Sequence, residues 1–141
     1  MGLLRKPLVA AFPRARYTGL EVSPYLCRRY GWIEGSIDCF RDAQPFDLVI
    51  CYDVVPYLDA LRGARALANL GRLCRGLLYF AALTREDWRE ICDRRRTDRG
   101  MYLRPAAWYR HRLRRHFVEL GVGFWLRRSC GVPVWRLERA P

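Results

Sequence analysis

The chain has 141 residues, enough for one domain with a buried core, and its apolar fraction of 51% excludes a disordered protein. No apolar run is long enough to span a bilayer and no secretory signal is recognisable, so we expect a cytoplasmic protein without membrane contact. The net charge of +12 lies entirely in residues 61–141, which contain 19 arginines and 7 acidic residues.

The first half of the chain alternates between helix and strand patterns, which is typical of an α/β fold with a parallel sheet. Ser23 is a predicted N-cap, Pro24 a first helical residue and Gly31 a helix end. In chain order we expect a helix over 3–12, a strand over 16–22, a helix over 24–30, and strands over 32–36 and 46–51.

The second half continues the alternation. Thr84 and Asp87 have the spacing of a capping box, and Pro105 is placed to open a later helix. We expect a helix over 57–73, a strand over 76–82, helices over 84–96 and 105–120, and strands over 124–127 and 132–137. The link between the last two strands is short enough to predict an antiparallel hairpin.

Three acid-bearing segments follow predicted strands, where ligands of open α/β sheets bind. Glu21 ends a strand and could accept hydrogen bonds from ribose hydroxyls, or interact with the dipole of the next helix. Asp38 follows Ser36 and Ile37 and could accept an adenine amine while Ile37 packs on the ring, or belong to an Asx-type turn. The third segment places Cys51, Tyr52 and Asp53 after a buried strand.

These segments resemble class I S-adenosylmethionine-dependent methyltransferases of the small bacterial type. In that family an acid corresponding to Glu21 ends the second strand, and Ser36, Ile37 and Asp38 match the residues around adenine. Residues 46–54 match the fourth strand and its polar loop, 77–82 the fifth strand, and 123–137 a terminal antiparallel hairpin.

The resemblance implies a doubly wound, mostly parallel, Rossmann-like sheet that ends in this hairpin. It implies S-adenosylmethionine as the cofactor, a small-molecule methyl acceptor and no metal. The implied cofactor contacts are Glu21, Val22, Ser36, Ile37, Asp38, Cys51, Tyr52 and Asp53. No catalytic residue is assigned, although Tyr52 and Asp53 are the nearest candidates for a general base.

The family begins with a strand and a glycine-rich loop that have no counterpart before Met1 and Gly2. We therefore expect residues 1–141 to form a single domain that is truncated at its N-terminus and binds the cofactor weakly by itself. The missing strand would lie between the strands that end at Glu21 and Cys51, so we also expect self-association through unpaired strands.

Two alternatives remain open: a non-catalytic basic binding module, and an inactive methyltransferase fragment. Nucleic acid is not the favoured partner, because the arginines are scattered among apolar residues and indicate a solvated face. Trp108, Tyr109 and Trp125 are expected in the core, and His111 and His116 at the surface. The six cysteines form no CxxC pair and are expected to be reduced.

Overall fold

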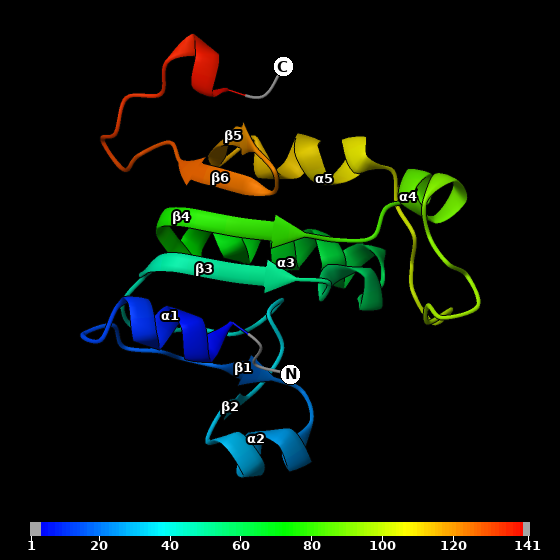
Figure 1. Ribbon diagram of the computed structural model, residues 1–141, viewed down its shortest axis with the longest axis horizontal. Helices are drawn as coiled ribbons and strands as arrows, with labels where there is room; N and C mark the ends of the chain where they lie inside the picture. Colours follow the sequence, from blue (N-terminus) through cyan, green and yellow to red (C-terminus); the bar gives the residue numbers. More distant parts are fainter. Residues whose placement is uncertain (1–3, 140–141) are drawn as a thin grey trace. The chain divides into compact units, whose positions relative to one another are not determined.

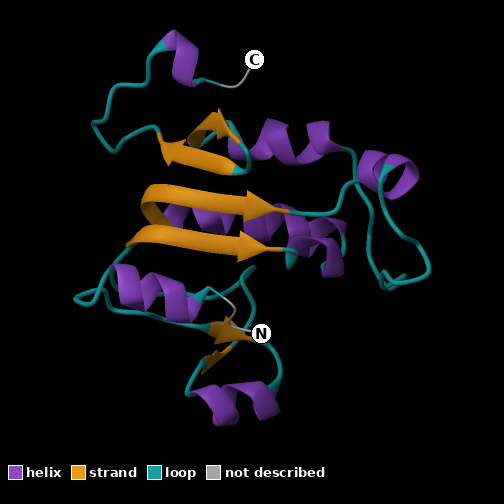
Figure 2. Cartoon of the chain, in the orientation of Figure 1, coloured by secondary structure: helices purple, strands orange, loops and turns teal. Residues whose placement is uncertain are grey.

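The computed structural model describes residues 4–139 and divides into two compact units, one up to Ile37 and the other from Asp38 onward. Each unit has its own sheet, drawn as separate groups of arrows in Figure 2. The expected α/β class is confirmed. No helix within the described part of the chain is long and apolar enough to cross a membrane.

The smaller unit contains α1 (Arg5–Ala11), β1 (Leu20–Glu21), α2 (Pro24–Tyr30) and β2 (Ile33–Glu34). The strands pair in parallel and are shorter than expected, while both helices are confirmed. The expected start of the first helix at Leu3 lies outside the described residues. The limits of α2 follow from local chemistry: the Ser23 hydroxyl accepts from the Leu26 amide at 3.4 Å, and Gly31 ends the helix at φ 67°.

The larger unit is built on a four-stranded sheet with the order β3-β4-β6-β5. Its strands are β3 (Phe46–Tyr52), β4 (Cys74–Ala81), β5 (Phe117–Gly121) and β6 (Phe124–Arg127). β3 and β4 are parallel, whereas β6 is antiparallel to both β4 and β5. This four-stranded sheet is therefore mixed, and the expectation of a mostly parallel sheet holds for its β3–β4 pair and for the separate β1–β2 pair.

The helical elements of the larger unit include α3 (Ala60–Leu73), which packs along the β3–β4 pair (Figure 1). Asp59 caps it by accepting from the Arg62 amide at 2.9 Å. Leu67 and Leu70 of α3 pack in the core with Leu78 and Phe117, all fully buried. The other helical elements are η1 (Val55–Tyr57), α4 (Arg85–Glu90), α5 (Ala106–Leu113) and η2 (Arg136–Glu138).

The C-terminal third differs from the expected elements. The helix expected through Leu120 ends at Leu113, and β5 begins after a short turn, at Phe117. Gly121, Val122 and Gly123 all have positive φ and make the turn of the β5–β6 hairpin. The antiparallel hairpin exists, but its strands are Phe117–Gly121 and Phe124–Arg127, and residues 132–137 form no strand.

Two other helices are also shorter than expected. α3 begins at Ala60, because η1 and the cap at Asp59 precede it. The capping box of α4 is confirmed, since the Thr84 hydroxyl accepts from the Asp87 amide at 3.1 Å and the Asp87 carboxylate accepts from the Thr84 amide at 3.0 Å. That helix ends at Glu90 instead of near Arg96.

Candidate functional site

The parallel strands β3 and β4 end at the same edge of their sheet, the edge at which open α/β folds bind ligands. Asp53 follows β3 with φ 54°, and its amide donates to the Ala81 carbonyl at 2.8 Å. One Asp53 carboxylate oxygen accepts from the Leu83 amide at 3.4 Å. The structure thus holds Asp53 against the end of β4, in a backbone conformation that is uncommon for residues other than glycine.

The neighbours of Asp53 have different exposures. Tyr52 is 62% exposed, and its ring lies parallel to Tyr79 with centroids 6.4 Å apart. Cys51 is buried in register with Phe80 of β4. Burial and the charge of Asp53 raise the pKa of the Cys51 thiol to about 12, so this thiol stays protonated and unreactive at neutral pH.

Glu21 lies at the end of β1 and is half-buried. Its Oε1 accepts from the Val22 amide at 2.8 Å and the Ser23 amide at 3.0 Å, immediately before α2. The sequence allowed two roles for Glu21, a contact with ribose or an interaction at the start of the next helix, and these hydrogen bonds are of the second kind. No hydrogen bond to Oε2 exists within residues 4–139, so one carboxylate oxygen remains for a ligand hydroxyl.

Ser36 and Ile37 follow β2 and are half-buried in the smaller unit. The Gly35 amide donates to the Glu21 carbonyl at 2.9 Å, so the structure brings the segment before Ser36 beside the end of β1. Val22, next to Glu21, is 65% exposed. The predicted contacts of this unit therefore lie close to one another.

Asp38 is buried in the larger unit and bonds to arginines of α3. Its carboxylate accepts from Arg62 Nε at 3.1 Å, Arg62 Nη2 at 3.2 Å and Arg65 Nη2 at 3.3 Å. Nearby, the Phe40 carbonyl accepts from the Asn69 side chain at 2.9 Å. These contacts fasten the segment to α3. An adenine amine would have to share this carboxylate with two guanidinium groups.

The β4–α5 connection brings further polar residues to the Asp53 turn, and the sequence-based prediction did not include them. Arg104 is buried, and its guanidinium donates to the Leu58 carbonyl at 2.6 Å and the Val55 carbonyl at 3.3 Å. The Tyr102 amide donates to the Pro56 carbonyl at 2.7 Å. These bonds hold the 102–104 segment against η1.

Two tyrosines stand next to this turn. Burial and the charges of Asp98 and Asp53 raise the pKa of the Tyr57 phenol. Tyr109 of α5 is only 4% exposed, with its ring 5.6 Å from Phe80, and its hydroxyl has no hydrogen-bond partner in the described part of the chain. Tyr57 follows Asp53 by four residues and could have been suspected from the sequence. Nothing in the sequence indicated Asp98, whereas Tyr109 was expected in the core, and its burial confirms this.

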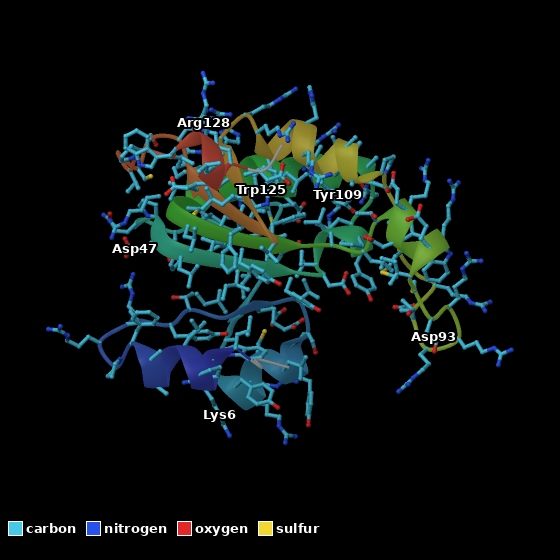
Figure 3. The ribbon with its side chains drawn as sticks, turned by 45° about the horizontal axis from the view of Figure 1, so that its top comes forward. Lys6, Asp47, Asp93, Tyr109, Trp125 and Arg128 are labelled. Carbon is cyan, nitrogen blue, oxygen red and sulfur yellow. The ribbon has the colours of Figure 1, made fainter. Side chains whose placement is uncertain are left out.

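Figure 3 draws the side chains as sticks, and many nitrogen-tipped side chains project outward from the ribbon. Some arginines of the larger unit form ion pairs, and others lie over aromatic rings. Glu119 accepts from Arg110 at 2.8 Å and from Arg114 at 3.0 Å. Two guanidinium groups lie over the Trp108 ring, that of Arg104 at 4.6 Å and that of Arg112 at 3.9 Å from the ring centroid. Burial lowers the pKa of Arg112, and the charges of nearby arginines lower it further.

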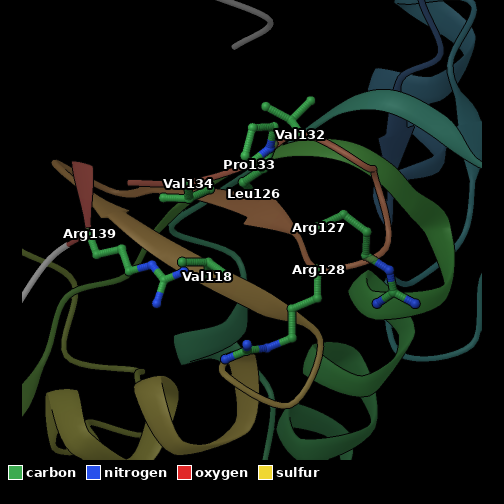
Figure 4. Close-up of a pocket in the computed structure, with 8 residues that line it drawn as sticks. All are labelled: Val118, Leu126, Arg127, Arg128, Val132, Pro133, Val134 and Arg139. Atoms are coloured by element: carbon green, nitrogen blue, oxygen red, sulfur yellow. The ribbon is translucent and has the colours of Figure 1, made fainter. Parts of the chain in front are cut away.

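The larger unit also contains a cavity of about 250 Å³ beside the β5–β6 hairpin (Figure 4). No acidic side chain is present among the described residues that line it, which are Val118, Leu126, Arg127, Arg128, Val132, Pro133, Val134 and Arg139. None of the predicted site residues lines this cavity. Within residues 4–139, no group of three or more histidine, cysteine or acidic side chains could hold a metal ion.

Comparison with known proteins gives a likeness in fold only. No protein-family model matches the chain, and no curated protein matches its sequence. Its fold is similar to the N-methyltransferase NodS from Bradyrhizobium japonicum WM9 in complex with S-adenosyl-L-homocysteine. That match has a TM-score of 0.61 and 20% identity, and covers 81% of this chain and 67% of that chain.

A second NodS structure gives a TM-score of 0.58 at 20% identity, over 79% of this chain and 73% of that chain. These matches show that the chain shares its fold with a solved methyltransferase, in agreement with the fold that the sequence resemblance predicted.

Proposed function

We propose that the protein transfers a methyl group from S-adenosylmethionine to an acceptor, which we take to be a small molecule. The proposal is carried by the methyltransferase fold together with the Glu21 carboxylate at the end of β1. One of its oxygens is held by backbone amides, and the other accepts no hydrogen bond from residues 4–139. The NodS structure of the same fold holds S-adenosyl-L-homocysteine, the product that remains after methyl transfer.

We propose that Glu21 holds the cofactor ribose. Oε1 is fixed by the Val22 and Ser23 amides, so the carboxylate is already oriented and Oε2 can accept a hydroxyl. Val22 would lie beside the ribose, and Ser36 and Ile37 beside the adenine. Asp38 would reach the adenine amine only by sharing its contacts with Arg62 and Arg65.

Cys51, Tyr52 and Asp53 are proposed to border the methionine portion of the cofactor and the acceptor. Bound S-adenosylmethionine supplies an activated methyl group, and the protein contributes mainly proximity and orientation. The protonated Cys51 thiol offers packing and no nucleophile. Asp53, half-buried at the strand end, can orient the acceptor and take up its proton.

Calorimetric titration of S-adenosylmethionine tests this function. The family that the chain resembles begins with a strand and a glycine-rich loop. The titration therefore uses the 141-residue chain and a chain extended at its N-terminus by such a segment. We expect weak binding by the first and tighter binding by the second. If neither chain binds S-adenosylmethionine, the proposed methyl transfer is wrong, and a basic binding module or an inactive fragment becomes the better interpretation. Equal affinities would remove the proposed need for the added segment.

A further inference from the structure

We propose that the cavity beside the β5–β6 hairpin is a binding site for a small organic anion with an aliphatic body. Arg128 and Arg139 would hold the anionic group, and the aliphatic residues of the cavity would surround the rest of the molecule. None of the residues assigned to S-adenosylmethionine lines this cavity. The site is therefore additional to the proposed methyl transfer and does not depend on it.

The apolar wall of the cavity is the outer face of the hairpin together with the C-terminal segment. Val118 of β5 and Leu126 of β6 are direct partners in the strand register, so their side chains lie on the same face of the sheet. Trp125, the neighbour of Leu126, is only 4% exposed and lies on the opposite face, toward the core. Residues 132–134 line the cavity from the C-terminal segment (Figure 4). The apolar part of the lining is therefore aliphatic and contains no aromatic ring.

The size of the cavity suits an organic molecule. Its volume is about 250 Å³, whereas a single water needs only about 10–15 Å³ of such volume. Ligand sites in proteins are typically concave and mainly apolar, with a few polar groups that fix the orientation of the ligand. An alkyl chain of a few carbons would leave water and pack on the aliphatic lining.

Two guanidinium groups of the lining remain available to a ligand. Arg128 donates from Nε to the Arg114 carbonyl at 3.0 Å, which fixes the side chain, and its two Nη groups have no partner within residues 4–139. Arg139 forms no hydrogen bond and no ion pair with the described part of the chain. Both guanidinium groups lie on the Val118 side of the cavity in Figure 4.

Arg127, the third arginine of the lining, is directed elsewhere. It follows Leu126 on β6, so its side chain leaves the opposite face of the strand. Its guanidinium lies 5.7 Å from the centroid of the Phe117 ring, which belongs to the core. Figure 4 accordingly shows this guanidinium pointing away from those of Arg128 and Arg139. The proposed contacts with the anion are therefore limited to Arg128 and Arg139.

Among the described residues, no carboxylate is paired with either of these two arginines. Glu138, next to Arg139, accepts from the Trp135 amide at 2.7 Å. Glu119, next to Val118, forms ion pairs with two other arginines, at 2.8 and 3.0 Å. An arginine side chain presents a planar fork of N–H donors that matches a carboxylate or a phosphate. Two such groups beside an aliphatic cavity without an acidic side chain thus favour an amphipathic anion.

The test uses probes that separate the head group from the body: hexanoate, hexanol, hexylamine and acetate. Each is titrated into the isotope-labelled 141-residue chain, and binding is followed by NMR at the backbone amides of Val118 and Leu126. We expect hexanoate to bind at least about fivefold more tightly than hexanol, because the arginines hold its carboxylate. It should bind at least about tenfold more tightly than acetate, which lacks the aliphatic body. Hexylamine should bind more weakly than hexanol, and added salt should weaken hexanoate but not hexanol.

Matched variants assign the site. Arg139→Gln should weaken hexanoate at least about threefold and leave hexanol unchanged, because only a charge is lost. Arg136→Gln is the control, since Arg136 is exposed in the same C-terminal segment and does not line the cavity. Val134→Trp should abolish the binding of hexanoate and hexanol, because the larger side chain fills the cavity. The thermal midpoint of this variant, measured in parallel, shows whether it is folded.

Several outcomes would overturn the proposal. Hexylamine or acetate binding as tightly as hexanoate would contradict a site for an amphipathic anion. Equal effects of Arg139→Gln and Arg136→Gln, or hexanoate binding by a folded Val134→Trp variant, would place the ligand elsewhere. The arginine variants alter exposed side chains and decide the question if Val134→Trp does not fold. Absence of hexanoate binding would overturn this site alone, because titration of S-adenosylmethionine tests the proposed methyl transfer separately.

Discussion

The two units of the chain differ in how much core they contain. In the larger unit, α3 has seven buried residues, and α3, β4 and β5 contribute side chains with no exposed surface. In the smaller unit, α1 has no buried residue, α2 has only Cys27, and both residues of β2 are exposed. Because burial of apolar surface is the main source of stability, the larger unit should determine the stability of the fold.

The smaller unit instead concentrates polar groups at strand ends. Glu21 and Glu34 stand opposite each other in the β1–β2 register, and Cys27 donates its thiol to the Glu21 carbonyl at 3.3 Å. Burial and the charges of Glu34 and Glu21 raise the pKa of Cys27. The core that stabilises the fold and the proposed ribose contact therefore lie in different units of the chain. A substitution in one unit should change the free energy of unfolding without changing cofactor affinity, and a substitution in the other should do the reverse.

The largest effect should come from the core of α3. Leu67 has no exposed surface, and Leu67→Ala should lower the free energy of unfolding by about 2–5 kcal/mol because it leaves a cavity. Val9 of α1 is 38% exposed, and Val9→Ala should change stability by about 0.5 kcal/mol or less. Urea denaturation measures both. Similar losses would contradict the contrast between the units.

Leu61→Ala serves as a control within α3. Leu61 is 68% exposed, so its truncation should resemble that of Val9 and not that of Leu67. A large loss at Leu61 would mean that the helix itself, and not the core behind it, had been disturbed.

A smaller effect is expected where the larger unit begins. Asp38→Asn removes the charge that Arg62 and Arg65 share and should destabilise the protein by about 1–3 kcal/mol, because the Asp38 side chain is only 3% exposed. The matched control is Asp47→Asn. Asp47 pairs with Arg75, and because both side chains are exposed, loss of this ion pair should change the free energy of unfolding very little. Denaturation of both variants at neutral pH provides the comparison. Equal effects would show that Asp38 does not anchor α3.

The smallest effect concerns pH. His116 packs against Gly71, where a Cβ atom would lie 2.5 Å from its ring, and burial and then the charges of Arg127 and Arg115 lower its pKa. The folded state therefore prefers the neutral ring, and its contribution to stability is present above the unfolded pKa of about 6.5 and is lost as the pH falls through the lower folded value.

Unfolding measured at pH 7.5 and pH 5.5 checks this sign. We expect a loss of stability between these pH values that His116→Gln reduces and His111→Gln does not, since His111 is exposed on α5. A greater stability of the wild type at pH 5.5 would contradict the expected protonation behaviour.

The sequence predicted the elements that are determined by local chemistry. Ser23, Pro24 and Gly31 define α2, and Thr84 with Asp87 defines the start of α4, because caps act within a few residues. The 117–121 segment was misassigned because Phe117 and Leu120 also fit a helical stripe. Its strand conformation depends on pairing with β6, which local spacing does not encode.

Contacts between distant residues limited the prediction of the site. The carboxylate of Asp38 is bonded to residues 24 and 27 positions away, and a sequence motif cannot reveal these partners. Asp98 lies in the connection between β4 and α5, which Arg104 holds to the carbonyls of Val55 and Leu58. Tyr109 lies in α5, the helix that follows this connection. The strand ends were predictable, but the residues brought to them by the later connection were not.

The most direct measurement of the proposed function compares two acids that stand opposite each other. S-adenosyl-L-homocysteine is titrated calorimetrically into the wild type, Glu21→Gln and Glu34→Gln, in whichever of the 141-residue and extended chains binds more tightly. Only Glu21 has its carboxylate oriented by the Val22 and Ser23 amides. We expect Glu21→Gln to weaken binding at least about tenfold and Glu34→Gln to leave it unchanged. An unchanged dissociation constant for Glu21→Gln, or equal losses in both variants, would contradict the ribose contact.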